Sequence, residues 1–162
     1  MKKLFIIAAT ILLCINAFAQ DGRSIYNKYS DEPGVSAVYI SPSMFKLIGK
    51  IPSLEIGSDG EKVDITPIIK SLKGFYLLNC SDDSVNGKLS SEVKKFINSN
   101  NFELMMEAKD DGETVRIMTN GDDDTIQSFV MTVVGNGGTT FISMDGLISR
   151  EAFEKLMKAA TR

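Results

Sequence analysis

The fold of this chain is decided by residues 103–149, which read ELMMEAKDDGETVRIMTNGDDDTIQSFVMTVVGNGGTTFISMDGLIS. Two dipeptides in this stretch, Asp111-Gly112 and Asn136-Gly137, are favoured two-residue connections of β-hairpins, because both central residues of such a turn need a positive φ. Apolar residues alternate with polar ones on either side of each turn. The stretch therefore predicts two hairpins, with strands near residues 102–109, 114–119, 125–134 and 139–145.

The two turns also fix which residues lie opposite each other. The first hairpin pairs Ala108 with Val115, Glu107 with Arg116, Met106 with Ile117 and Met105 with Met118. The second pairs Phe129 with Met144, Met131 with Ile142 and Val133 with Thr140. A turn over residues 120–124 joins the hairpins, with Thr119 opposite Thr125 and Val115 opposite Phe129. The prediction is a four-stranded antiparallel meander.

In these registers one face of the meander is apolar, and the closing helix packs on it through a stripe of Phe153, Leu156, Met157 and Ala160. The other face is half apolar, and a solvated sheet face is normally more polar. Three covers for this half-apolar face remain open: the first half of the chain, a second subunit, or a partner or ligand. We interpret it as a possible interaction face formed by Met105, Met118, Ile126, Val130 and Phe141.

The first half of the chain alternates short helices and strands. Helices are predicted over 23–30, from Pro42, from Asp64 to before Gly74, and over the stripe Leu89, Val93, Phe96 and Ile97. Strands are predicted over 35–40 and 75–80, the second buried on both faces, and residues 51–61 are an irregular edge or loop. The predicted fold class is α+β, a two-layer sandwich with a largely antiparallel sheet of about six strands and helices packed on one face.

The N-terminus predicts export. Lys2 and Lys3 precede an apolar run over 4–15, and the small-x-small triplet over 17–19 follows, which is the order of a cleavable signal peptide. The run is too short to span a bilayer. We therefore expect residues 1–19 to be removed and residues 20–162 to form a single α+β domain. Lipidation at Cys14 remains an alternative, although Leu13 precedes it where a small residue is usual.

Cleavage would change the charge and the cysteine content. The whole chain has 18 basic and 21 acidic residues, so losing Lys2 and Lys3 leaves a formal charge of −5. Cys80 would be the sole cysteine, which excludes an intrachain disulfide, and we interpret it as a small buried hydrophobe. The mildly acidic chain has no basic cluster, which argues against nucleic acid as a partner. No transmembrane segment is expected in the mature chain.

The chain contains no histidine. This excludes Ser-His-Asp and Cys-His catalysis and the two-histidine zinc helix. The acidic stretch over 120–124 resembles the start of a calcium loop, but Thr125 and Met131 stand where such a loop needs Gly and Glu. We expect no cofactor, no metal and no catalytic residues. A Ser-Lys pair or paired carboxylates would be needed for an enzyme, and no motif marks either.

Four segments carry a family resemblance: Tyr26-Asn-Lys-Tyr, Gly34-Val-Ser-Ala-Val-Tyr-Ile-Ser-Pro-Ser-Met-Phe, Leu104-Met-Met-Glu-Ala-Lys-Asp-Asp-Gly-Glu-Thr-Val-Arg-Ile and Phe141-Ile-Ser-Met-Asp-Gly. Together they resemble domain-of-unknown-function family 4252, small exported proteins of Bacteroidetes. The resemblance implies a shared fold and a place in the periplasm, the cell envelope or the extracellular space, and it supplies no catalytic residues. Such proteins are encoded beside sigma-factor systems for envelope stress, which implies a regulatory or interaction role.

The expected function is therefore that of an exported, non-catalytic envelope protein. It would act by protein or surface interaction, through a protein partner or a homo-oligomer, with a link to envelope-stress regulation. The alternative is a periplasmic carrier or sensor of a small apolar ligand held between sheet and helices, which would show as a closed apolar pocket.

Overall fold

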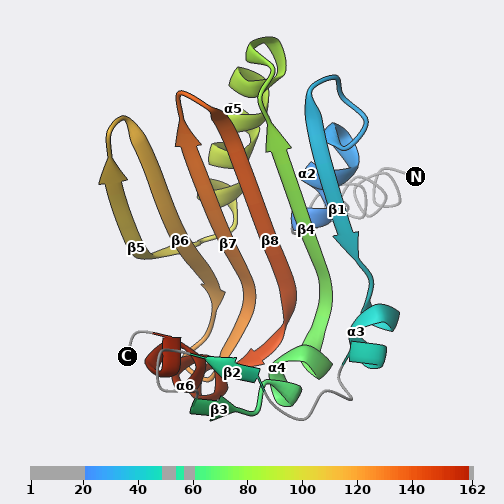
Figure 1. The fold of residues 1–162 in the computed structure, drawn as a ribbon, viewed down its shortest axis with the longest axis vertical. Coiled ribbons are helices and arrows are strands. Elements are labelled where there is room, and N and C mark those ends of the chain that lie inside the picture. Colours follow the sequence, from blue (N-terminus) through green and yellow to red (C-terminus); the bar gives the residue numbers. More distant parts are fainter. Residues whose placement is uncertain (1–20, 49–53, 57–60, 161–162) are drawn as a thin grey trace, which may run out of the picture.

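A computed structural model describes residues 21–48, 54–56 and 61–160 (Figure 1). Its main sheet has six strands in the order β1-β4-β8-β7-β6-β5, and every neighbouring pair is antiparallel. The strands are β1 (Val35–Ile40), β4 (Leu72–Cys80), β5 (Glu103–Asp110), β6 (Glu113–Gly121), β7 (Thr125–Gly135) and β8 (Gly138–Ser149). The predicted α+β class and the C-terminal four-stranded meander are confirmed.

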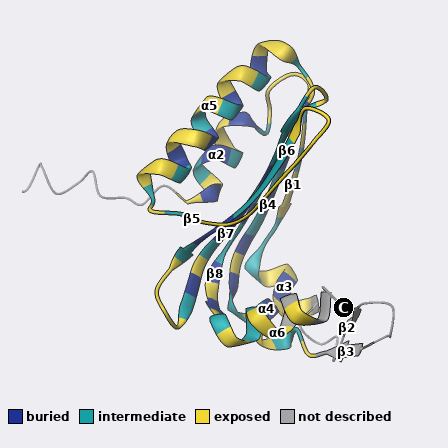
Figure 2. Cartoon of the chain, turned by 90° about the vertical axis from the view of Figure 1, so that its left-hand side faces the viewer, coloured by how far each residue is buried: buried dark blue, intermediate teal, exposed yellow. Residues whose placement is uncertain are grey.

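The helices divide between one face and one end of this sheet (Figures 1 and 2). They are α2 (Gly22–Tyr29), α3 (Pro42–Ile48), α4 (Thr66–Ser71), α5 (Asp83–Ser99) and α6 (Arg150–Ala160). Helices α2 and α5 cover one face, whereas α3, α4 and α6 lie around one end. Among the described residues, no helix is long and apolar enough to cross a membrane.

Two aspartates start the helices that cover the sheet. The Asp21 side chain accepts a hydrogen bond from the Ser24 N–H, and the Asp82 side chain accepts from the N–H groups of Ser84 and Val85. Each carboxylate satisfies backbone donors that the first helical turn leaves unpaired. A hydrogen bond from the Ser84 hydroxyl, together with those from the two backbone N–H groups, holds the pKa of the Asp82 carboxyl below its usual value.

Both hairpin registers are confirmed, with one exception. Ala108 lies opposite Val115 and Met131 opposite Ile142, as the turns require. The exception is Met105, since a register shift pairs Leu104 rather than Met105 with Met118. A β-bulge of this kind leaves one residue unpaired.

The connection between the hairpins differs from the prediction. Strand β6 continues to Gly121 and β7 begins at Thr125, so the turn is tighter than residues 120–124. The Asp122 carboxylate accepts hydrogen bonds from the N–H groups of Asp124 and Thr125 and closes this turn. Thr119 therefore lies opposite Phe129 instead of Thr125, a shift of four positions from the expected partner. An even shift leaves every side chain on its expected face.

Helices α2 and α5 cover the half-apolar face of the meander. Leu89, Val93 and Phe96 of α5 and Ile25 of α2 pack against sheet residues of the main core, among them Phe141. We call this side the helix-covered face. The remaining sheet members of the main core are Leu78, Cys80, Met118 and Val130. The first half of the chain therefore covers the half-apolar face, which is one of the three alternatives that the sequence left open.

A second, smaller core fills the end of the sheet near α3, α4 and α6. It contains Phe45, Ile69, Leu72, Ile126 and Ile148. The ring of Phe153 on α6 lies 5.9 Å from that of Phe129, so the closing helix does pack on the predicted face, but only at this end. The side-chain burial of Leu156, Met157 and Ala160 lies outside the described residues.

Two further predictions need correction. Strand β4 begins at Leu72, so Gly74 lies inside a strand instead of ending a helix, and only alternate residues of β4 are buried. The other residues of β4 are not buried because no helix in the described part of the chain covers the middle of the sheet face on which they lie (Figure 1). The expected irregular edge over 51–61 holds β2 (Leu54–Ile56), which pairs with β3 (Glu61–Val63). Residues 1–19, the predicted signal peptide, lie outside the described residues.

Candidate functional site

The structure separates the five residues predicted to form an interaction face. Met118, Val130 and Phe141 lie in the main core, and Ile126 lies in the second core. Their exposed fractions are 4% or less, so none of the four can contact a partner in this fold. Only Met105, on the edge strand β5, is exposed. The prediction is wrong for the four buried residues, because the chain's own helices cover that face.

The opposite side of the sheet carries an apolar surface instead, which we call the open face. It is turned toward the reader in Figure 1, and above α6, β2, β3 and α4 no element among the described residues crosses it. Its middle is formed by Val38, Leu77, Ile117, Met131 and Ile142, five half-buried or exposed residues from five strands. Leu77 pairs with Ile142, which pairs with Met131, which pairs with Ile117, so the surface is continuous.

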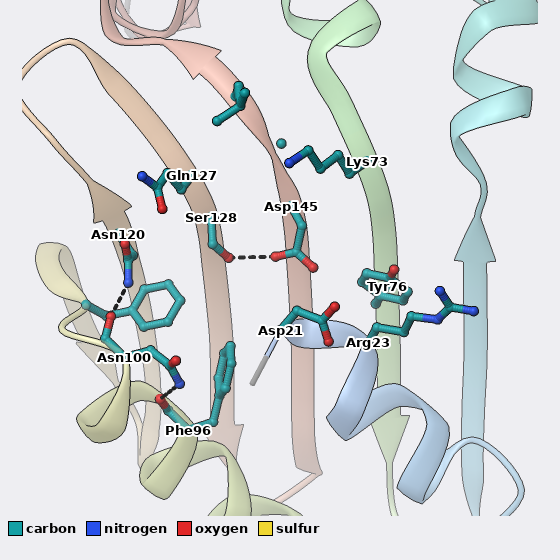
Figure 3. A pocket seen from close by; sticks show the side chains of 13 residues that line it. Asp21, Arg23, Lys73, Tyr76, Phe96, Asn100, Asn120, Gln127, Ser128 and Asp145 are labelled. Atoms are coloured by element: carbon teal, nitrogen blue, oxygen red, sulfur yellow. Dashed lines mark hydrogen bonds between the residues drawn. The ribbon is translucent and has the colours of Figure 1, made fainter. Parts of the chain in front are cut away.

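A polar pocket of about 430 Å³ opens on the helix-covered side (Figure 3). It lies where the N-terminus of α2 and the C-terminus of α5 leave the sheet uncovered. Its floor comes from β4, β6, β7 and β8, and its wall from the two helix ends. The lining includes Asp21, Arg23, Lys73, Tyr76, Phe96, Asn100, Asn120, Gln127, Ser128 and Asp145.

Register shifts in three neighbouring strand pairs shape the pocket floor. Between β4 and β8 the shift leaves Lys73 unpaired, and between β6 and β7 it leaves Gln127 unpaired. Between β7 and β8, Gly146 and Leu147 together oppose Gln127 alone. All four of these residues line the pocket. A β-bulge redirects side chains, so the shifts at this level bring Lys73 and Gln127 to the pocket, whereas strict alternation would send them to the other face.

Asp145 is a half-buried carboxylate on the pocket floor. Its Oδ1 accepts hydrogen bonds from the Ser128 hydroxyl at 2.8 Å and the Ser143 hydroxyl at 3.4 Å. Its Oδ2 is buried and has no hydrogen-bond partner among the described residues. Burial raises the pKa of the Asp145 carboxyl, and nearby Asp21 adds to the rise, while the Ser128 hydrogen bond and the N–H of Gly22 oppose it.

The other pocket groups distribute charge around Asp145. Burial, with Asp145 as the next cause, raises the pKa of the Tyr76 hydroxyl to about 12, so this phenol stays protonated at neutral pH. The Lys73 side chain extends from β4 toward β8, whereas the Arg23 side chain points toward β1 (Figure 3). The Asn120 amide donates to the Asn100 carbonyl and ties β6 to the end of α5.

This arrangement suits recognition better than metal chemistry. No group of three or more His, Cys, Asp or Glu side chains in the described part of the chain could hold a metal ion. Cys80 is fully buried, as expected. The pocket offers two carboxylates, two cationic side chains, amides and aromatic walls, which is a set of binding groups.

Comparison with known proteins gives one match. The profile of Domain of unknown function (DUF4252) matches residues 29–156. The chain belongs to this family. No curated protein and no solved structure matches the chain. This member of the DUF4252 family therefore has to be understood from its own geometry.

The pocket is not evident from the sequence, although part of its signal is present there. Asp145 follows Phe141 and Ser143 at alternate positions, so any register that buries Phe141 also directs a carboxylate inward. Lys73 and Gln127 carry no such signal, because the register shifts that bring them to the pocket have no signature in the local sequence.

Proposed function

We propose that this DUF4252 protein is an exported, non-catalytic envelope protein that docks another protein on its open face. The observation that supports the proposal most directly is the apolar surface over five strands, with Val38 at its β1 side 46% exposed. Antiparallel sheets with one solvated face normally place polar residues there. An apolar patch of this kind on a soluble protein is typical of a docking surface.

The electrostatics of the open face support the same proposal. No strand residue in its middle is charged, whereas the whole chain has a formal charge of −3. Interface centres are depleted of charged residues relative to the remaining surface. A partner can therefore cover this region without burying an unpaired charge.

Site-specific photo-crosslinking in the producing cell tests the docking proposal. A photoreactive residue replaces Val38 or Met106 on the open side of the sheet, and in the control it replaces Lys94 or Lys95, exposed on α5. The proposal expects a defined adduct from the two sheet positions only, and expects Met131→Lys to abolish it while the protein stays folded. Adducts of equal yield from α5, or adducts unaffected by Met131→Lys, contradict the proposal.

A second copy of the chain could cover the open face equally well. Light scattering of the purified protein separates the two cases, since a dimer that Met131→Lys converts to a monomer identifies the partner as this same chain. A monomer that still forms the sheet-specific adduct in the cell identifies a different protein.

The export proposal rests on the N-terminal sequence and the envelope-stress link on the family resemblance. Mass spectrometry of the protein recovered from the envelope tests export. The expected N-terminus is Gln20. A retained Met1, or a lipid-modified Cys14, would contradict cleavage after Ala19.

One observation favours the alternative function, a carrier of a small apolar ligand. A groove of about 380 Å³ lies between the sheet and α6, lined by Met105, Met106, Ile117, Phe153, Glu154 and Lys158. Most of this lining is apolar, and Met side chains adapt to ligands of different shape. Native mass spectrometry that finds a co-purified lipid-like molecule, lost on Ile117→Lys, would favour the carrier over the docking protein.

A further inference from the structure

We propose that the pocket around Asp145 binds a small zwitterion, a free amino acid or a dipeptide, with its ammonium on Asp145 and its carboxylate on Lys73. The pocket lies on the helix-covered side, opposite the open face, so this site is independent of the proposed docking surface (Figures 1 and 3).

The fold itself builds the pocket. Three adjacent strand pairs shift register at the same level, and each shift leaves a residue that lines the cavity. A single bulge is a common local irregularity, but bulges are over-represented next to functional sites because they redirect side chains. Three together interrupt the sheet's pairing where a continuous ladder would otherwise form.

One oxygen of Asp145 lacks a well-formed hydrogen bond. Buried polar atoms almost always have a hydrogen-bond partner, and an exception calls for an explanation. The Gly22 N–H is near enough to lower the pKa of the Asp145 carboxyl, but Oδ2 has no hydrogen bond of normal geometry among the described residues. Protonation would remove the charge but would leave a buried O–H with no acceptor there. Oδ2 has almost no exposed surface, so a ligand ammonium reaches it when the carboxyl group turns toward the pocket, where the ammonium supplies a donor and neutralises the charge.

The pocket carries opposite charges on two sides. Asp21 lies beside Asp145 and contributes to its raised pKa, so this side of the pocket is negative. Lys73 approaches from β4 and forms no ion pair with another described residue (Figure 3). One negative and one positive side fit a ligand that carries both charges better than a simple cation or anion.

The size and lining of the pocket also fit such a ligand. A volume of about 430 Å³ accommodates a single amino acid or a dipeptide, and it lies within the usual range for small-molecule sites. The amides of Gln127 and Asn120 can bind a peptide group, while Phe96 and Phe102 provide an apolar wall for a side chain.

The test titrates the purified protein with four probes and follows backbone amide NMR signals. L-alanine and alanyl-alanine carry both charges, N-acetyl-alanine lacks the ammonium, and alaninamide lacks the carboxylate. The proposal expects either zwitterion to shift the signals of Gly22, Asp145 and Gly146. It expects each single-charge probe to bind at least about tenfold more weakly, which is the loss of one charge-assisted hydrogen bond.

Variants locate the two charges. Asp145→Asn and Lys73→Met should each weaken zwitterion binding at least about tenfold, whereas Asp110→Asn and Lys70→Met, at exposed positions away from the pocket, should not. Thermal unfolding of each variant shows that it is folded. The proposal is overturned by no zwitterion binding at up to about 10 mM, by equal binding of N-acetyl-alanine, or by unchanged affinity in Asp145→Asn.

Discussion

Gly22 at the start of α2 lies directly against Ser143 of β8, so closely that a Cβ atom at position 22 would overlap the Ser143 side chain. The same Cβ position is 3.6 Å from Asp145 Oδ2. Ser143 is fully buried and cannot move into solvent. This contact sets the height of α2 above the sheet next to the polar pocket, which the neighbouring residues Asp21 and Arg23 line.

Gly22→Ala should therefore destabilise the protein by about 2 kcal/mol, the usual cost of overpacking a well-filled site. Urea denaturation measures it. The matched control is Gly87→Ala within α5, where a Cβ meets nothing within 4 Å. That change should stabilise the protein by about 1 kcal/mol, because alanine favours a helix interior over glycine. Equal effects of the two substitutions would show that α2 does not lie against Ser143.

Asp145→Asn should raise the stability at neutral pH by about 1 kcal/mol, because it removes the charge of a partly buried carboxylate and keeps an oxygen that can accept from Ser128. The pH dependence has a definite sign. Burial raises the folded-state pKa of Asp145 above the unfolded value of 3.8, so the ionised form is disfavoured in the fold. This penalty is present above the folded-state pKa and disappears as the pH falls through it.

The advantage of Asp145→Asn should accordingly shrink as the pH is lowered toward 3.8. Denaturation of both proteins across this range measures the difference. An advantage that does not change with pH would contradict the buried, ionised state of Asp145. A variant that is more stable than the natural protein but no longer binds zwitterions would show that the carboxylate serves the pocket at the expense of stability.

The assignment of the two sheet faces makes a prediction on neighbouring residues of β8. Phe141 is fully buried and its ring meets that of Phe96 edge-on at 6.2 Å, whereas Ile142 is half-buried on the open face. Phe141→Ala should cost about 4 kcal/mol. Ile142→Ala should cost about 1 kcal/mol, since it removes only partly buried area. Chemical denaturation gives both values, and a larger cost at Ile142 would mean that the faces are reversed.

The sequence predicted strands and turns well because their signals are local. The Asp111-Gly112 and Asn136-Gly137 turns set the pairing on both sides, and all three pairs predicted around the second turn are present. The joining turn was misjudged because β6 continues to Gly121 and the Asp122 carboxylate closes a shorter turn, so that Thr119 pairs with Phe129 instead of Thr125. No dipeptide signal marks that position.

The faces could not be assigned from the sequence, because alternation shows which residues share a face but not which face the helices cover. Both faces of this meander are largely apolar, and the more apolar one, with Ile117 and Met131, was the obvious choice for the core. The structure covers the other face because α2 and α5 dock there through Ile25, Leu89 and Phe96. The pocket was missed for a related reason, since register shifts at Lys73 and Gln127 depend on pairing across several strands.

The central claim is that the open face is covered by a partner in the envelope. Methionine oxidation tests it directly, because sulfoxide formation follows exposure of the side chain. Met106 and Met131 lie on the open side, Met118 is buried beneath the helices, and Met44 is exposed on α3 beyond the sheet.

Mass spectrometry compares oxidation of the four methionines in the purified protein and in intact cells. In the purified protein we expect Met44 and Met106 to oxidise fastest, Met131 more slowly and Met118 slowest. In cells we expect slower oxidation of both Met106 and Met131. The ratio of Met44 oxidation to Met118 oxidation should stay the same as in the purified protein. Oxidation of Met106 and Met131 in cells at the rate of the purified protein would contradict a covered open face.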